Sequence, residues 1–545
     1  MNKLQVIGRV PMVAAAVLIF AGCGGGARTG ADADDKMIVR FANAAEPSDL
    51  DPHAVSGLPE YQAVTCLLEG LTRLHPRTLE PLPGQAESWE ISDDGLVYTF
   101  HLRENAKWSN GDPVTAQDFV RSWRRILLPS FGSEYSYMLH AVVGARAFNR
   151  GEITDFGQTG FKALDERTVQ ITLAHPTSYF LKLLIHQSWM PVHLPTLEKF
   201  GGAERKGTRW TRAENFVGNG ALVMREWVPQ QHIIMEPNPH YWDRSSVKLD
   251  ELHVLPIDNA DTEERMYRTG QVDITYSLPL SKIDTYRDES PESVDIAPAF
   301  VGAYFRVNVT RPAFADSRVR RALGMALDRE AIARQVWRGT KFPAYSFTPP
   351  GVEGFEPGTP FRDDVTAARA LLAEAGYPDG EGFPPFDILY PTSDNGRSVC
   401  EALQQMWRAN LGIDVRLHNQ EWKVYLDSMN TLDYDVTLGI WGGDYLDPMT
   451  FLDTLASSSG NNRTGWGSAA YDQLLDEVSR EQNEAARLAL FARMEQIIGA
   501  EVPVIPIYHY SKVRVVRPTI RGWYANALDV HPLHLLWIDD SVGAN

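Results

Sequence analysis

The sequence has little cysteine, no excess of positive charge and no long apolar run beyond its first 22 residues. Three cysteines in 545 residues are too few for a disulfide framework to organise the fold, and their spacing leaves open whether Cys66 and Cys400 pair. Later apolar stretches stay shorter than the roughly 20 residues of a transmembrane helix. Lysine and arginine number 52 against 70 aspartates and glutamates, a formal net charge of −18. This balance argues against a nucleic-acid partner, because phosphate binding requires a basic face.

Recognisable catalytic motifs are also missing. The chain has no Gly-x-Ser-x-Gly elbow, no His-Glu-x-x-His pair and no Walker loop. Two histidine pairs, His531 with His534 and His186 with His193, lack cysteines or carboxylates at metal-ligand spacing. We therefore predict no catalytic residue, no bound metal and no cofactor. Because carboxylates are abundant, an exported hydrolase stays open as a competing class.

The first 35 residues have the pattern of a targeting segment. Two basic residues precede an apolar stretch, residues 10–22, that is too short to span a bilayer. The stretch ends in Phe-Ala-Gly-Cys, which resembles a bacterial lipoprotein signal with phenylalanine in place of the usual leucine. We predict a signal peptide over residues 1–22, lipidation of Cys23 and a flexible polar tether over residues 23–35. The alternative is an ordinary secretory signal with an incidental cysteine. Either signal predicts an exported protein, periplasmic or at the cell surface.

The body of the chain mixes strand and helix patterns, which indicates an α/β fold. Its length exceeds what one hydrophobic core supports, so two or more lobes are expected. Strands are predicted at 37–43, 97–102, 168–173, 386–390, 413–417 and 434–441. Amphipathic helices are predicted at 115–127, 316–337 and 363–378. No repeat of fixed period and no long linker divides the body, so the lobes are expected to be interleaved.

A long signature lies at residues 84–123. It reads GQAESWEISDDGLVYTFHLRENAKWSNGDPVTAQDFVRSW and resembles the extracellular solute-binding proteins of peptide ABC importers. Shorter matches follow the family order on both sides of it. They are 49-DLDPH-53, 66-CLLEGL-71, 218-GNGAL-222, 235-MEPNPHYWD-243, 317-SRVRRALGMALDRE-330, 343-PAYSFTPPG-351, 388-ILYPTSD-394, 418-HNQEWKVYLD-427 and 503-PVIPIYHY-510. The likeness is strongest to the oligopeptide-binding members, around NQEW and WGGDYLDP.

The resemblance implies two α/β lobes of the large, peptide-binding type II periplasmic-binding-protein fold, with a ligand cleft between them. Lobe I is expected to be discontinuous, over residues 36–68, 197–300 and 512–545. An extra subdomain, residues 69–196, is expected to be inserted in it. Lobe II is expected to span residues 301–511. The hinge would then lie near residues 300 and 511.

The resemblance also implies a function in transport. An oligopeptide would bind between the lobes, the lobes would close over it, and the closed form would deliver it to the transmembrane subunits of an ABC permease. The protein is expected to be a monomer and not an enzyme. Other ligands stay open within the same transport role, namely a nickel chelate, haem, a sugar or a modified peptide. A peptide-processing hydrolase or a peptide-handling chaperone is the alternative from a different class.

Eight ligand-binding residues follow from the resemblance. They are Asp444, Trp441, Trp422, Gly439, Gly443, Tyr135, Tyr276 and Tyr304. Asp444 corresponds to the family carboxylate that binds the peptide α-amino group, and a carboxylate accepts strongly from the three donors of an ammonium. The aromatic residues are expected to line side-chain pockets, and the two glycines to offer backbone groups. Read without the family, Asp444 is equally a turn residue and the aromatics are equally core residues.

The sequence has no basic residues at the positions where family members bind the carboxyl end of the peptide. Family members place basic residues at several depths of the cleft, and the corresponding residues here are not basic. They are Trp337, Gly396, Met429 and Leu438. Arg338 and Arg397 stand one residue along from two of these, and Ser56 replaces an acidic residue. We therefore expect a protein that tolerates varied peptide lengths or takes a peptide with a modified carboxyl end.

Overall fold

The computed structural model describes residues 36–539 and residue 541. The predicted signal peptide at 1–22, the predicted tether at 23–35 and Cys23 lie outside the described residues. None of the described helices combines the length and apolar composition needed to cross a membrane. Met37 and the described residues that follow it form one packed unit.

The first sheet joins the start of the described chain to its middle. Its order is β1 (Ile38–Ala42), β10 (Glu251–Leu255), β9 (His232–Pro237), β8 (Leu222–Val228). β1 and β10 are parallel, with Ile38 opposite Glu251, although they are far apart in sequence. The helices of the same segments are α1 (Leu58–Leu67), α5 (Leu194–Lys199), α6 (Ala260–Arg268) and α7 (Ile283–Glu289).

A second four-stranded sheet is antiparallel and lies wholly between residues 86 and 172. Its order is β4 (Ala86–Ile91), β5 (Val97–Leu102), β7 (Thr168–Thr172), β6 (Phe161–Ala163). The neighbouring short elements are β2 (Thr72–Leu74), β3 (Pro81–Pro83), α3 (Ala145–Asn149) and α4 (Phe180–Leu183). β2 and β3 pair as a hairpin. The strands predicted at 97–102 and 168–173 are therefore confirmed.

Helix α2 (Ala116–Leu127) packs against this second sheet and follows its predicted pattern. Thr115 and Asp118 form a reciprocal capping box at its start, which satisfies backbone donors that the first turn leaves free. Phe119 and Trp123 are fully buried, as their helical spacing predicts. The Trp123 indole N–H donates to the carbonyl of Trp189 at 3.0 Å, so the ring is buried without an unmet donor.

The largest sheet has six strands and holds the second half of the chain. Its order is β12 (Phe342–Pro343), β16 (Val504–Val515), β11 (Val294–Val307), β15 (Val436–Gly442), β13 (Phe386–Pro391), β14 (Val415–Gln420). β13, β14 and β15 confirm three predicted strands, with edges that shift by up to three residues. β13 runs parallel to both β14 and β15, whereas β11 runs antiparallel to both β15 and β16.

Helices surround the strands of this sheet. They are α8 (Ser317–Met325), α9 (Arg329–Ala331), α10 (Val365–Glu374), α11 (Asp394–Leu411), α12 (Trp422–Asn430), α13 (Met449–Leu452), α14 (Ala469–Arg480) and α15 (Glu484–Glu501). α10 confirms its prediction, with Asp364 as cap and Gly376 in the left-handed region after its end. The single helix predicted at 316–337 is wrong. It ends at Met325, and Asp328 caps a new turn by accepting from the Ala331 N–H.

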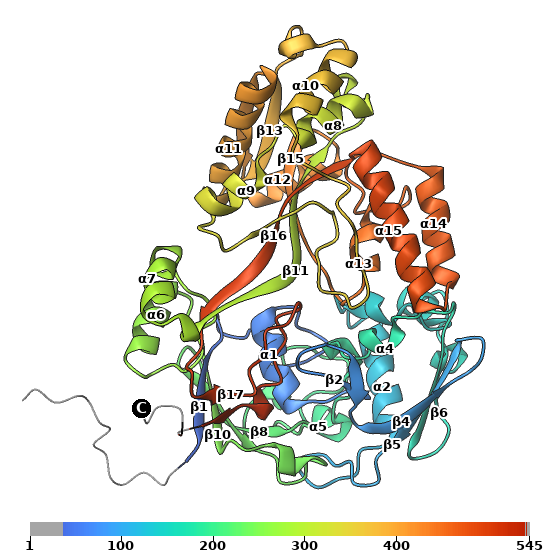
Figure 1. The fold of residues 1–545 in the computed structure, drawn as a ribbon. Coiled ribbons are helices and arrows are strands. Elements are labelled where there is room, and N and C mark those ends of the chain that lie inside the picture. The colour runs from blue at the N-terminus through green and yellow to red at the C-terminus, as the bar shows by residue number, and fades with distance from the viewer. Residues whose placement is uncertain (1–35, 540, 542–545) are drawn as a thin grey trace, which may run out of the picture. The chain divides into compact units, whose positions relative to one another are not determined.

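β11 and β16 run side by side along most of their length (Figure 1). The predicted hinge positions, residues 300 and 511, fall inside these two strands. Most residues of one large hydrophobic core come from the part of the chain between residues 300 and 511. Most residues of a second core come from the first half of the chain. Cys400 is buried in the former and Cys66 in the latter, and both are free thiols. The C-terminal strands β17 (Ile520–Arg521) and β18 (Trp537–Ile538) form a separate pair.

Candidate functional site

Asp444 lies in the loop directly after β15, and backbone contacts hold this loop in place. The preceding Gly443 donates its N–H to the carbonyl of Phe300 on β11 at 2.9 Å. A Cβ at Gly443 would come within 3 Å of the Phe300 ring, so only glycine fits this close approach. The Asp444 N–H donates to the Thr450 hydroxyl at 3.2 Å. These contacts leave the carboxylate free to project from the strand end.

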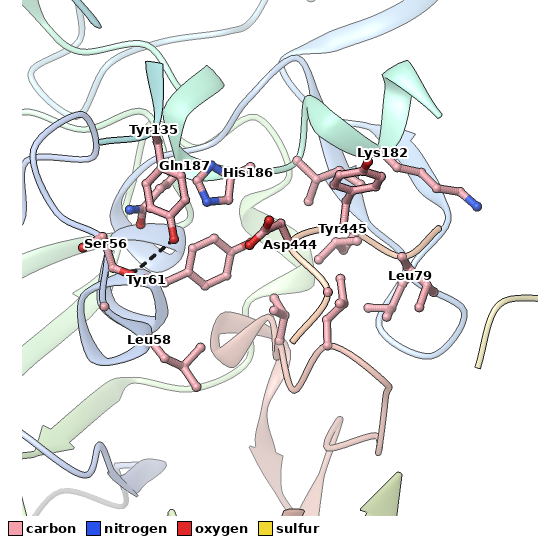
Figure 2. Close-up of a pocket in the computed structure, with 17 residues that line it drawn as sticks. Ser56, Leu58, Tyr61, Leu79, Tyr135, Lys182, His186, Gln187, Asp444 and Tyr445 are labelled. Atoms are coloured by element: carbon pink, nitrogen blue, oxygen red, sulfur yellow. Dashed lines mark hydrogen bonds between the residues drawn. The ribbon is translucent and has the colours of Figure 1, made fainter. Parts of the chain in front are cut away.

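Two neighbouring cavities share Asp444 and Tyr445 in their walls. The smaller has a volume of about 210 Å³ and the larger about 690 Å³. Figure 2 shows the smaller cavity, where Tyr61, Tyr135, His186 and Asp444 face the same space. Its walls come from α1, from Tyr135 in the segment after α2, from residues 182–187 and from the loop after β15. Segments that are distant in sequence therefore converge on Asp444.

The wall around Tyr135 is ordered by polar and aromatic contacts. The Tyr135 hydroxyl donates to the carbonyl of Ser56 at 3.4 Å, drawn as a dashed line in Figure 2. Its ring meets His186 edge to face, with 4.4 Å between the ring centres. Burial lowers the pKa of His186 to about 4, so this imidazole is neutral at pH 7. The smaller cavity thus offers aromatic surface and no positive charge from this histidine.

The larger cavity holds two carboxylates, Asp444 and Asp453. Loss of solvent raises the pKa of Asp444, and a hydrogen bond from the Tyr137 hydroxyl acts in the opposite direction. Burial, followed by the charges of Asp444 and Asp447, raises the pKa of Asp453 to about 7. Among the described residues, no basic side chain lies within ion-pair distance of Asp444 or Asp453. The cavity is therefore suited to a cation.

A buried ion pair anchors the loop that carries Asp444. Asp447 and Arg487 of α15 form two hydrogen bonds, and Arg487 also lines the larger cavity. Tyr179 and Tyr445 stack in parallel across the same cavity wall, with 4.9 Å between their ring centres. The Arg487 guanidinium lies over the Tyr179 ring at 5.4 Å. The loop that carries Asp444 is thus held by a buried ion pair and by aromatic packing.

Residues 80–463 match the family described as bacterial extracellular solute-binding proteins, family 5, middle region. The chain belongs to this family. A relative, the periplasmic oligopeptide-binding protein OppA of Salmonella typhimurium strain LT2, is 38% identical over 504 residues, or 90% of each chain.

Two solved structures of family 5 relatives have the same fold as this chain. One is the unliganded open form of the periplasmic murein tripeptide binding protein MppA, with a TM-score of 0.82 and 35% identity over 92% of this chain and 98% of its own. The other is Haemophilus influenzae OppA in complex with RPPGFSPFR, with a TM-score of 0.71 and 34% identity over 93% and 99%. These matches confirm the predicted fold class, α/β of the periplasmic-binding-protein type II.

Four of the predicted ligand residues of this family 5 chain gather around the two cavities. Gly443, Asp444 and Tyr135 line the smaller cavity, and Trp441 lines the larger one. The Trp441 indole N–H donates to the carbonyl of Thr450 at 2.7 Å, which fixes its ring beside Asp444. These four residues share a location around the two cavities, and their contacts with a ligand stay predictions.

The other four predicted residues lie elsewhere. Trp422 is 58% exposed and stacks on Tyr425, outside both cavities. Tyr276 accepts a hydrogen bond from the Lys512 ammonium at 3.1 Å. Tyr304 is buried in β11, and Gly439 faces it from β15. The structure does not bring these residues to Asp444, so their role in binding stays a prediction.

Several cavity residues were not predicted from the sequence. Tyr61, Tyr137, Tyr179 and Asp453 surround Asp444 without belonging to the quoted motifs. Tyr137 follows two residues after the predicted Tyr135, and this spacing is the one sequence signal that could have found it. The remaining three reach the cavities only through the packing of distant segments.

The positions that lack basic residues are mostly buried. Trp337, Met429 and Leu438 are at most 5% exposed, so their apolar character fits the core. Arg338 pairs with Asp284 at 3.2 Å and is therefore already engaged. Arg397 is exposed on α11. Neither arginine lines the two cavities around Asp444.

Proposed function

We propose that this chain is the substrate-binding protein of an ABC importer and that it captures oligopeptides. The observation that carries the proposal is the Asp444 carboxylate, which projects into two cavities without a basic partner among the described residues. Support comes from its family and from relatives whose names state oligopeptide binding. In this function Asp444 binds the peptide α-ammonium, which donates up to three hydrogen bonds to it.

The proposed mechanism is closure of two lobes over the peptide. Lobe I comprises 36–68, 197–300 and 512–545 with the insertion 69–196, and lobe II comprises 301–511. The chain passes between the two lobes near residues 300 and 511, within the long strands β11 and β16, and these strands serve as the hinge. A bound peptide favours the closed form because it contacts both lobes at once.

Asp444 makes closure selective for a ligand with a free amine. In an open cleft its charge is partly hydrated, although loss of solvent already raises its pKa. Closure removes more water, and a buried unpaired carboxylate is strongly disfavoured. A peptide ammonium offsets this cost by pairing with the Asp444 carboxylate. Main-chain hydrogen bonds to an extended peptide then add affinity without reading its sequence.

The cellular setting is part of the same proposal. The protein is exported, to the periplasm or the cell surface, with a lipid on Cys23 as its membrane anchor. It acts as a monomer, meets the transmembrane subunits of a permease and has no catalytic activity. The alternative within the same role is a ligand other than a plain peptide, such as a modified peptide or a metal chelate.

Calorimetric titration with alanine peptides tests the proposal. The tetrapeptide with a free amine should bind, and its N-acetylated form should bind at least tenfold more weakly. Asp444→Asn should remove this preference, whereas Asp433→Asn, which changes an exposed aspartate paired with Arg311, should keep it. Mass spectrometry of the ligand that co-purifies with the protein, and of peptide after incubation, completes the test. Binding that ignores acetylation, or cleavage of the peptide, would contradict the proposal.

A further inference from the structure

We propose that Arg306, assisted by Arg463, is a second charged subsite that receives the carboxylate at the far end of the peptide. This inference rests on the proposed function, because it assigns the other end of the ligand that Asp444 anchors. The sequence alone predicted no fixed charge there, since Met429 and Leu438 are apolar. The structure places a cation from a neighbouring strand against this region.

Arg306 lies on β11, opposite Thr437 of β15, and is only 6% exposed. Its guanidinium extends from there to Gly439, the next β15 residue on the same face. A Cβ at Gly439 would come within 3 Å of the guanidinium, so the glycine leaves the space that this group fills. The next β15 residue on that face is Trp441, beside Asp444. The guanidinium therefore lies on the strand surface that leads to the amine anchor.

The partners of Arg306 are too weak for its charge. One nitrogen donates to the Tyr304 hydroxyl at 2.8 Å, and another approaches the Met429 sulfur at 3.6 Å. The guanidinium also lies over the Tyr304 ring at 4.9 Å. A guanidinium has five N–H donors, and a thioether is a weak acceptor. Among the described residues, no carboxylate lies within ion-pair distance of Arg306.

Arg463 adds a second cation to the same place. Burial, followed by the charge of Arg306, lowers the pKa of Arg463. Its Nε is buried and has no hydrogen-bond partner among the described residues. No described carboxylate is within ion-pair distance of this arginine either. Arg306 is buried and Arg463 is partly buried. Two guanidinium groups that repel each other are stabilised by a shared anion, and a planar carboxylate matches their donor geometry.

The spacing along β15 suits the two ends of one peptide. Asp444 stands five residues after Gly439, and a strand rises about 3.3 Å per residue, so the two sites lie at most roughly 16 Å apart along the chain. An extended peptide of about four or five residues covers this span at roughly 3.3 to 3.6 Å each. A carboxylate is also the one charge that every unmodified peptide carries at the end opposite its ammonium. A peptide carboxylate is therefore favoured over a free inorganic anion.

The test compares free-acid and carboxyl-amidated alanine peptides of three, four and five residues on the wild-type protein. Alanine leaves the two termini as the only charges of the ligand. We expect the free acid of the four- or five-residue peptide to bind roughly tenfold to a hundredfold more tightly than its amide. Equal affinity of acid and amide at every length would overturn the inference and favour a tolerant carboxyl end. If no peptide binds in either form, the proposed function itself fails.

Variants then assign the preference to the arginines. Arg306→Met should lower the ratio of acid to amide affinity to near one, while N-acetylation should still weaken binding. Arg306→Lys should retain part of the ratio because it keeps the charge. Arg463→Gln, at a less buried site, should reduce the ratio even if Arg306→Met fails to fold. Arg318→Met serves as the control, because this exposed arginine pairs with Asp316 on α8. An unchanged ratio in folded Arg306→Met or Arg463→Gln protein would overturn the assignment.

Discussion

Arg487 and Asp447 form a two-pronged ion pair with nitrogen–oxygen distances of 2.6 and 2.7 Å, and each side chain is 1% exposed. Asp447 stands three residues after Asp444 and also accepts the N–H of Met449 at 3.0 Å. Arg487 comes from α15 and packs over the ring of Phe491 at 4.7 Å. The pair therefore ties the loop that carries the proposed amine anchor to the longest helix beside it.

Removing one partner of this pair should destabilise the protein. Arg487→Met leaves Asp447 buried without its cation, and the free energy of unfolding should fall by about 3 to 5 kcal/mol. Urea denaturation followed by tryptophan fluorescence measures this change. Arg493→Met, an exposed position on the same helix, should change the stability by less than about 0.5 kcal/mol. A loss for Arg487→Met no larger than for this control would show that the pair is not structural.

The close approach at Gly443 makes a second prediction. Gly443→Ala places a methyl group within 3 Å of the Phe300 ring and should destabilise the fold by about 1 to 3 kcal/mol. The loop must also shift, so affinity for a free-amine peptide should fall more than the stability loss alone explains. Gly460→Ala is the matched control, because nothing lies within 4 Å of a Cβ there. Thermal unfolding and peptide titration of both variants, at a temperature where both are folded, separate the two effects.

The sequence predicted those parts of the fold that depend on local pattern. The helix at α2 and the strands β5, β7 and β13 follow from apolar spacing and capping residues, and the structure confirms them. The helix at 316–337 was wrong because spacing alone does not reveal that Asp328 caps a new turn after Ala326 ends the first. The break therefore lies between the C-cap of α8 at Ala326 and the N-cap of α9 at Asp328.

The site was predictable only where one motif contains it. Asp444, Gly443 and Trp441 belong to WGGDYLDP and could be found from a family resemblance. Asp453 and Tyr61 could not, because they reach the cavities through packing between distant segments. Arg306 was missed for a related reason. Its meeting with Gly439 depends on the register between β11 and β15, which are more than 120 residues apart.

Asp453 should make stability depend on pH. Its pKa is about 7 in the folded protein and 3.8 without the surrounding structure. Between these values the folded protein binds more protons at this site than the unfolded chain, so ionisation of Asp453 lowers stability as pH rises. Asp453→Asn removes this effect, so its melting temperature relative to the wild type should rise between pH 4 and pH 8. Asp472→Asn is a control from a nearby helix, and a constant difference across this range would contradict the pKa assignment.

The same carboxyl group should release a proton when a peptide binds. At pH 7 Asp453 is about half protonated, and the ammonium brought to Asp444 stabilises its charged form. Binding enthalpies measured in buffers of different ionisation enthalpy should therefore reveal a release of up to about half a proton. The release should be absent from Asp453→Asn at pH 7. At pH 9, where Asp453 is already ionised and the free peptide amine, of pKa about 8, is mostly neutral, binding should instead take up protons. An N-acetylated peptide provides the ligand control, because it brings no ammonium. A buffer-independent enthalpy for the free-amine peptide at pH 7 would place its ammonium away from the Asp444–Asp453 cavity.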